Sequence, residues 1–349
     1  MSMLTFLGSQ WMHRALRPKQ WHQWSLSLPD LSRSLGDRVS KDRVRVAVVQ
    51  FSLDPVVEPL GWLNRVTECF RQASEQQADI IVFGEDMASS LLGVLQRFVP
   101  KSATAGPLRD LLPWLTALSP VTYQFWYRTM KVLSQRFGIT TVAGSAMTWH
   151  QRQLLNVGVT FDPAGREIAW QPKIHLLAME VALGMSPGSD LLAQVLDPWP
   201  LITLVCNDAT FYESFRMARL KGALLVAVPI ADPEPRYSVD KARRGAWARV
   251  QETPSAGLVG ASTGNLFGIP LTGKAGIYVP RELTPDGSGV LVESDHYTGE
   301  QVSIGCLDLS ALADLQENLV PWPLTSPWLD TVYSVKNGTS SPGAGPCIS

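Results

Sequence analysis

The sequence has 349 residues, of which 45% are hydrophobic and 17% are charged, and its formal net charge is −1. This length and composition allow one large α/β domain, or two smaller ones, with a sizeable buried core. The near-neutral charge, without a lysine- or arginine-rich block, argues against nucleic acid as a main partner, because neutralising phosphates requires concentrated positive charge. No apolar stretch approaches the length that crosses a bilayer, so we expect no transmembrane segment.

Cysteine and histidine spacing gives two further expectations. The four cysteines (Cys69, Cys206, Cys306 and Cys347) are scattered without paired spacing. We therefore expect no disulfide framework and a cytoplasmic location, where thiols stay reduced. The five histidines have no ligand spacing with cysteines or acids, so the sequence predicts no metal site.

The two ends of the chain differ in composition from its middle. Residues 1–42 mix tryptophans with arginine, proline and serine and have no sustained strand pattern. We predict an N-terminal extension that is not part of the core and packs on the surface or on a neighbouring subunit. A membrane-surface helix is the weaker alternative, because Pro18 and Pro29 break the pattern. Residues 321–349 are rich in Ser, Gly and Pro, which predicts a C-terminal tail.

Residues 43–320 have the pattern of one α/β domain. Residues 44–51 form an apolar, β-branched run, residues 60–73 repeat apolar side chains at helical spacing, and residues 79–84 form a second apolar run. Strand, helix and strand in this order indicate a βαβ unit, whose sheet is covered by helices. Further strands are predicted at 139–143, 155–161, 167–170, 201–205, 223–228, 257–262, 275–279, 289–293 and 301–307, and helices within 88–137 and over 210–221 and 237–253.

Cys206 lies between a predicted strand and a predicted helix. A thiol at such a turn is near the positive end of the helix dipole, which favours the thiolate, so we expect a lowered pKa and a nucleophilic role. The backbone N–H groups of this turn can also face a developing oxyanion. The alternative is a small buried hydrophobic residue, which most free cysteines are.

Two charged residues also follow predicted strands. Glu85 ends the run IIVFG, at the sheet edge where open α/β sheets place their sites. A partly buried carboxylate there would have a raised pKa and could act as a general base, whereas the alternative is an acid that caps the next helix. Lys173 follows the strand at 167–170, and such a lysine, taken alone, is more often a solvated loop residue.

Several motifs give these three residues a common context. The segments VAVVQ, IIVFGE, GITTVAGS, LLNVGVTFDPAGREIAWQPKIHL and LVCNDATFYESFRMARLKGALLVAVP occur in this order. From about residue 43 to about residue 318 the chain therefore resembles the nitrilase, or carbon–nitrogen hydrolase, superfamily. Each motif alone is weak evidence, but three in the correct order are highly specific.

The resemblance implies an α/β fold, namely a four-layer αββα sandwich that usually pairs into homodimers or higher homo-oligomers through its sheet-covering helices. It also implies a catalytic triad of Glu85, Lys173 and Cys206 that needs no cofactor. Many members have a second glutamate between the lysine and the cysteine, and Glu180 lies in a comparable place.

The implied activity is hydrolysis of a small-molecule amide or carbamoyl amide through a thioester acyl-enzyme, with the backbone N–H of Asn207 at the oxyanion. A nitrile-hydrolysing member commonly has tryptophan and glutamate after the cysteine, so Asn207 and Asp208 favour amides slightly. Other departures from the family pattern are Tyr212 and Thr253, which stand in place of a proline and an asparagine. A nitrilase, a soluble N-acyltransferase and a non-catalytic binding or assembly relative remain open.

Overall fold

The computed structural model describes residues 3–16, 18–31, 42–95, 112–191 and 199–318. The predicted C-terminal tail, residues 321–349, lies outside this described part. None of the described helices is both long enough and apolar enough to cross a membrane.

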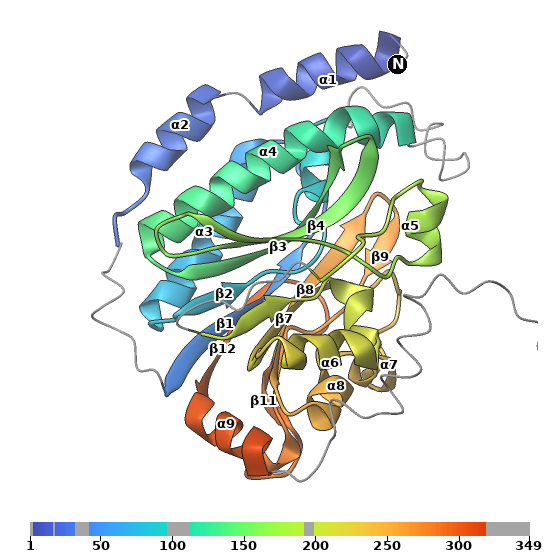
Figure 1. Ribbon diagram of the computed structural model, residues 1–349. Coiled ribbons are helices and arrows are strands. Elements are labelled where there is room, and N and C mark those ends of the chain that lie inside the picture. The colour runs from blue at the N-terminus through green and yellow to red at the C-terminus, as the bar shows by residue number, and fades with distance from the viewer. Residues whose placement is uncertain (1–2, 17, 32–41, 96–111, 192–198, 319–349) are drawn as a thin grey trace, which may run out of the picture.

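Two sheets lie at the centre of the chain (Figure 1). The first contains, in spatial order, β5 (Glu167–Pro172), β4 (Gln153–Phe161), β3 (Thr140–His150), β2 (Ile80–Val82), β1 (Arg43–Ser52) and β12 (Gln301–Asp308). The second contains β6 (Leu201–Thr203), β7 (Leu225–Ala231), β8 (Ala256–Leu266), β10 (Gly276–Tyr278) and β11 (Val290–Glu293), and β9 (Ile269–Leu271) pairs with the end of β8. The two sheets join where Gln50–Ser52 pairs with Ala261–Thr263.

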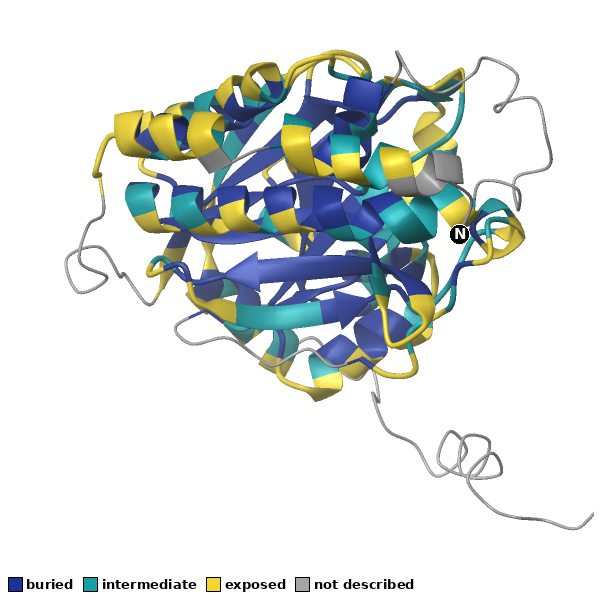
Figure 2. Cartoon of the chain, turned by 90° about the horizontal axis from the view of Figure 1, so that it is seen from above, coloured by how far each residue is buried: buried dark blue, intermediate teal, exposed yellow. Residues whose placement is uncertain are grey.

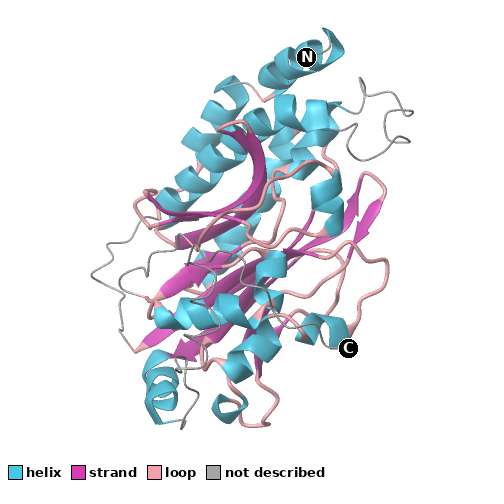
Figure 3. Cartoon of the chain, turned by 45° about the vertical axis from the view of Figure 1, so that its right-hand side comes forward, coloured by secondary structure: helices cyan, strands magenta, loops and turns pink. Residues whose placement is uncertain are grey.

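Helices cover the outer face of each sheet (Figures 1 and 3). The first sheet packs against α3 (Pro59–Glu75) and α4 (Leu112–Phe137), and the second against α6 (Tyr212–Leu220) and α8 (Ala246–Glu252), next to α7 (Val239–Arg243). The other elements are η2 (Ser89–Leu95), α5 (Ala178–Ala182), η5 (Cys206–Thr210), η6 (Arg281–Leu283) and α9 (Leu309–Asn318), the last helix of the described residues. The order helix, sheet, sheet, helix confirms the predicted αββα sandwich.

Side chains of β1 show how the layers are packed. Val44, Val46 and Val48 belong to the apolar cluster between the two sheets. Val49 and Phe51 point to the opposite face and join the cluster under α3 and α4. Successive side chains of a strand point to opposite faces, and all residues from Val46 to Ser52 are buried, so this part of β1 is covered on both sides. Figure 2 shows this burial through the middle of the molecule.

Most predicted elements are present, with shifted ends. The predicted helix over 237–253 is wrong as one element, because α7 ends at Arg243 and Gly245 precedes α8 as its N-cap. The helix expected directly after Cys206 begins only at Tyr212, and the 3₁₀ helix η5 takes the residues between. The elements β9, α5 and α9 were not predicted, and β9 and α5 are only three and five residues long.

The N-terminal segment forms two helices, α1 (Met3–Ala15) and α2 (Pro18–Ser27), which lie over α3 and α4 (Figure 1). Met12 of α1 is fully buried in an apolar cluster with residues of η2 and α4. The indole N–H groups of Trp21 and Trp24 donate to Thr129 Oγ1 at 3.1 Å and to Thr67 Oγ1 at 3.2 Å. The expectation that this segment is not part of the core is therefore wrong at Met12 and at Trp24, which is also buried.

Replacing Met12 tests whether α1 is an integral part of the fold. We expect Met12→Ala to lower the free energy of unfolding by about 2–5 kcal/mol, because it leaves a cavity in a closed cluster. Leu7, on the same helix, is 50% exposed, so Leu7→Ala should change stability by no more than about 0.5 kcal/mol. Urea unfolding of the two variants measures both values, and equal small losses would contradict the integral role of α1.

Candidate functional site

The ends of several strands bring four predicted site residues together. Glu85 lies three residues beyond β2, Cys206 lies three residues beyond β6, and Lys173 follows β5 directly. Five neighbouring strands, in the order β2–β1–β8–β7–β6, are all parallel to one another, so their carboxyl ends reach the same edge. This is the edge at which α/β sheets commonly hold their ligands. Glu180, in α5, completes the group.

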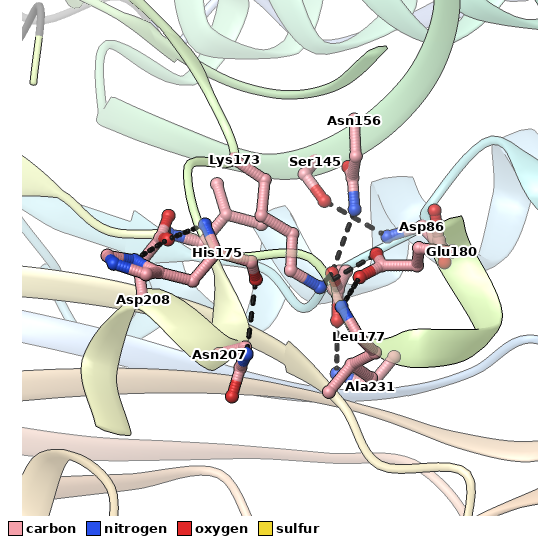
Figure 4. A network of polar contacts seen from close by, with 12 residues as sticks. Asp86, Ser145, Asn156, Lys173, His175, Leu177, Glu180, Asn207, Asp208 and Ala231 are labelled. Atoms are coloured by element: carbon pink, nitrogen blue, oxygen red, sulfur yellow. Dashed lines mark hydrogen bonds and ion pairs between the residues drawn. The ribbon is translucent and has the colours of Figure 1, made fainter. Parts of the chain in front are cut away.

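Lys173 is the centre of the polar network in Figure 4. Its side chain is completely buried, and Nζ donates to Glu85 Oε1 at 2.7 Å and to Glu180 Oε1 at 2.8 Å. Burial alone would lower the pKa of Lys173, but the carboxylates of Glu85 and Glu180, which bond its ammonium, outweigh it and raise this pKa. The lysine is therefore a buried, fixed ammonium, and the solvated-loop interpretation is wrong.

Glu85 is fixed from several directions. Besides Lys173, Asn156 Nδ2 donates to its Oε1 at 2.8 Å and the N–H of Ala231 donates to its Oε2 at 3.0 Å. Its own carbonyl oxygen accepts a hydrogen bond from Ser262 Oγ at 2.6 Å. Burial raises the pKa of Glu85 above its ordinary value, and Lys173 opposes this rise, which confirms the expected raised pKa.

Glu180 is fixed at the start of α5. Its Oε2 accepts a hydrogen bond from the backbone N–H of Leu177 at 2.6 Å, while its Oε1 faces Lys173. The side chain of Glu180 is 10% exposed, whereas that of Glu85 is 3% exposed. The two acids therefore share one ammonium, and Glu180 is the more accessible of the pair.

Cys206 stands at a strained turn. Its φ is +48°, in the left-handed region that a non-glycine residue rarely adopts, and the residue is partly exposed. The thiol makes a hydrogen bond with the Glu85 side chain. Burial of the sulfur, then the charge of Glu85, raise the pKa of the Cys206 thiol well above 9.0, although Lys173 opposes them.

The expected lowering of the Cys206 pKa is therefore wrong. The dipole argument required an α-helix that begins at the cysteine, but only the short 3₁₀ helix η5 begins there. The carboxylate of Glu85 is close enough to bond the thiol and repels the thiolate. The cysteine is thus a protonated thiol next to a carboxylate, an arrangement in which the acid can take the proton.

A second polar network ties the lysine loop to the cysteine loop. Asp208 is completely buried and accepts hydrogen bonds from the backbone N–H groups of Ile174 (3.1 Å) and His175 (2.7 Å) and from that of Val205 (3.2 Å). His175 Nδ1 also lies 2.9 Å from Asp208 Oδ1, and Asn207 Nδ2 donates to the His175 carbonyl oxygen at 3.2 Å. Figure 4 shows these bonds of Asp208, His175 and Asn207, which tie the loop after Lys173 to the loop around Cys206.

Sequence reasoning missed some members of the site. Asn156, Ala231 and Ser262 bond Glu85 from three different strands, and only the tertiary fold brings them there. Asn156 was part of a motif but had no role assigned. Within the described ranges, no group of three or more His, Cys, Asp or Glu side chains is arranged to hold a metal ion.

The sequence and the fold are similar to those of known proteins. The family model for carbon–nitrogen hydrolases matches residues 45–251, a span that contains all four of these site residues. No curated protein matches the chain. The fold is similar to that of the amidase from Nesterenkonia sp. AN1 (TM-score 0.57, 21% identity, covering 81% of this chain and 99% of the amidase). It is also similar to that of Nit3 from Saccharomyces cerevisiae, a member of branch 10 of the nitrilase superfamily (TM-score 0.62, 18% identity, covering 82% and 97%).

At these identities the solved structures establish the fold, while the family match covers more than half of the sequence. The chain belongs to the carbon–nitrogen hydrolase family.

Proposed function

We propose that this carbon–nitrogen hydrolase cleaves the amide or carbamoyl amide bond of a small molecule through a thioester on Cys206. The observation that carries the proposal is the bonding pattern around one carboxylate. Glu85 accepts a hydrogen bond from Lys173 at 2.7 Å and also bonds the thiol of Cys206. A base, an electrophilic cation and a nucleophile therefore lie within direct reach of each other.

The first half-reaction forms the thioester. Glu85 takes the proton of the Cys206 thiol while the sulfur attacks the carbonyl carbon of the substrate. The ammonium of Lys173 and the backbone N–H of Asn207 stabilise the oxygen that becomes negative, an effect worth about 3–4 kcal/mol per donor. The protonated Glu85 then gives its proton to the departing nitrogen, so ammonia or an amine leaves as the C–N bond breaks.

The second half-reaction returns the enzyme to its resting state. Water attacks the thioester carbon while Glu85 accepts a proton from this water. Glu85 returns that proton to the sulfur as the C–S bond breaks, so the carboxylic acid leaves and the thiol reforms. Glu180, the more exposed of the two acids, is placed to hold Lys173 and to assist this water. Every step moves a proton between groups of the protein and the substrate, so no cofactor enters the scheme.

The related amidase supports an amide as substrate. In a mutant of the Nesterenkonia enzyme, the acetamide moiety of fluoroacetamide adds covalently to the active-site cysteine, and another mutant was studied in complex with butyramide. The chemistry proposed for Cys206 is of the same kind. Homo-oligomer formation and a cytoplasmic location stay predictions from the family resemblance and from the cysteine pattern.

The covalent step can be tested on the protein itself. We expect incubation with a panel of small amides and carbamoyl amines to add the acyl mass to the peptide that contains Cys206, and to release ammonia. Cys206→Ala should lose both while it keeps its thermal unfolding temperature, whereas Cys306→Ala, which removes an exposed free cysteine, should retain both. Turnover by Cys206→Ala would rule out this nucleophile. Nitriles and added amines, tested in parallel, distinguish a nitrilase and an N-acyltransferase.

The raised pKa of Glu85 predicts the acid side of the pH profile. The base works only when it is ionised, so kcat/KM should fall as the pH decreases through the pKa of Glu85, with a midpoint above the ordinary value of 4.5. Glu85→Gln should lower kcat/KM by about 10²–10⁴-fold and remove this ionisation. A midpoint at or below 4.5 in the wild-type profile would contradict the assignment.

Removing the central ammonium should destabilise the fold in a pH-dependent way. Lys173→Met leaves buried carboxylates without their cation, which costs about 3–5 kcal/mol near neutral pH. Because the folded-state pKa of Glu85 would rise further, its ionisation opposes folding and the loss should be smaller at pH 5 than at pH 8. Thermal unfolding at both values measures this, with Lys131→Met, on the exposed side of α4, as control. A loss of stability in Lys173→Met that is the same at both pH values would contradict this role of the ammonium.

A further inference from the structure

Asp86, the residue after the proposed base, has no part in the mechanism above. Its Oδ1 atom is buried and accepts no hydrogen bond from any residue in the described ranges. The residue as a whole is partly exposed. Figure 4 shows Asp86 with the bond from its N–H to Ser145.

The backbone holds Asp86 in a fixed and unusual conformation. Its φ is +60°, in the left-handed region. Its N–H donates to Ser145 Oγ at 3.3 Å, and the next N–H, of Met87, donates to the Ser145 carbonyl oxygen at 2.9 Å. The strand β3 approaches so closely here that a Cβ atom on Gly144 would lie 1.9 Å from the Gly84 carbonyl oxygen. This close approach fixes the backbone of the turn that carries Asp86.

The carboxyl Oδ1 of Asp86 does not stabilise the turn through a hydrogen bond with any described residue. An aspartate in a turn usually accepts a hydrogen bond from a backbone N–H two residues on. No such bond to Asp86 is found in the described part of the chain. The acid instead lies close enough to Glu85 and Glu180 to be repelled by both, and burial, followed by these two charges, raises the pKa of Asp86 well above its ordinary value.

Without a ligand, this site contains more carboxyl groups than ammonium groups. Three carboxyl groups (Glu85, Asp86 and Glu180) surround one ammonium, and Lys173 already bonds two of them. A buried carboxyl oxygen without a donor costs free energy, which a cation or a strong hydrogen-bond donor in the substrate would recover. Asp86 Oδ1 therefore lacks a hydrogen-bond donor among the described residues, and a cationic donor would also offset the excess of carboxyl groups.

We propose that Asp86 is a specificity-determining residue that binds a cationic amine of the substrate. The preferred substrates are then small amides or carbamoyl amides that carry an ammonium group close to the bond that is cleaved. The ammonium donates a charge-assisted hydrogen bond to Asp86 and offsets the excess of carboxyl groups, while the scissile carbonyl group faces Cys206. This inference rests on the proposed function, because it names the substrate class of the same site.

Matched pairs of primary amides test the inference. Each ω-amino amide, from glycinamide to 5-aminopentanamide, is compared with the alkyl amide that has a methyl group in place of the ammonium, such as β-alaninamide with butyramide. We expect kcat/KM for at least one cationic amide to exceed that of its neutral partner by about tenfold or more. In Asp86→Asn this ratio should fall by about tenfold, because truncating one partner of a buried charge pair is costly.

The variant and its control are chosen to separate binding from folding. Asparagine is among the few residues that tolerate the left-handed region, so Asp86→Asn keeps the turn, and thermal unfolding checks this. Asp314→Asn makes the same chemical change on the exposed face of α9 and should keep the wild-type ratio.

Two negative outcomes have different meanings. A wild-type enzyme that acylates Cys206 with neutral amides but prefers no cationic amide, or an Asp86→Asn variant with an unchanged ratio, would overturn the role of Asp86 and leave the proposed function intact. If no amide, charged or neutral, adds mass to Cys206, the proposed function itself fails.

Discussion

A buried ammonium between two carboxylates is the interaction on which the rest of the site depends. Taking charges out of water costs several kcal/mol per ion, so Lys173 can stay buried only because Glu85 and Glu180 bond it at 2.7 and 2.8 Å. These bonds join residues that are 88 and 7 positions apart in the sequence. Lysine suits this place because a compact ammonium is a point charge that both carboxylates can approach.

The same arrangement decides the protonation state of the cysteine. Burial of the sulfur, together with the Glu85 carboxylate that bonds the thiol, disfavours the thiolate, and the lysine, already shared by two acids, does not reverse this. A resting thiolate is therefore not the starting point of the proposed reaction, and the proton must move to Glu85 as the sulfur attacks. Strained backbone at Cys206 and Asp86, both at positive φ, places the thiol and a third carboxyl group at the site.

Local sequence patterns predicted much of the fold, because the strands that are buried on both faces are continuous apolar runs. The runs before Glu85 and Cys206 identified β2 and β6, and the ordered motifs predicted which three side chains would meet. Periodicity did not reveal the core contacts of Met12 and Trp24, because each comes from a short helix that is stabilised by tertiary packing.

The electrostatics of the site were less predictable than its members. The pKa of Cys206 depends on a carboxylate that lies 121 positions earlier in the sequence, and a local argument from the helix dipole gave the wrong direction. The contacts of Asn156 and Ala231 with Glu85 likewise arise only when separate strands meet. No spacing rule marked Asp86, since its significance lies in a hydrogen bond that its carboxyl group lacks.

The most direct measurement of this account is the ionisation of the Cys206 thiol. The thiolate absorbs in the ultraviolet, so the difference in absorbance between the wild type and Cys206→Ala, followed against pH, reports this pKa. We predict a wild-type value above 9.0 and a lower value in Glu85→Gln, where the repelling charge is gone and Lys173 remains. A wild-type cysteine that is already ionised at neutral pH, or a pKa that Glu85→Gln does not lower, would contradict the central role given to the Glu85 carboxylate.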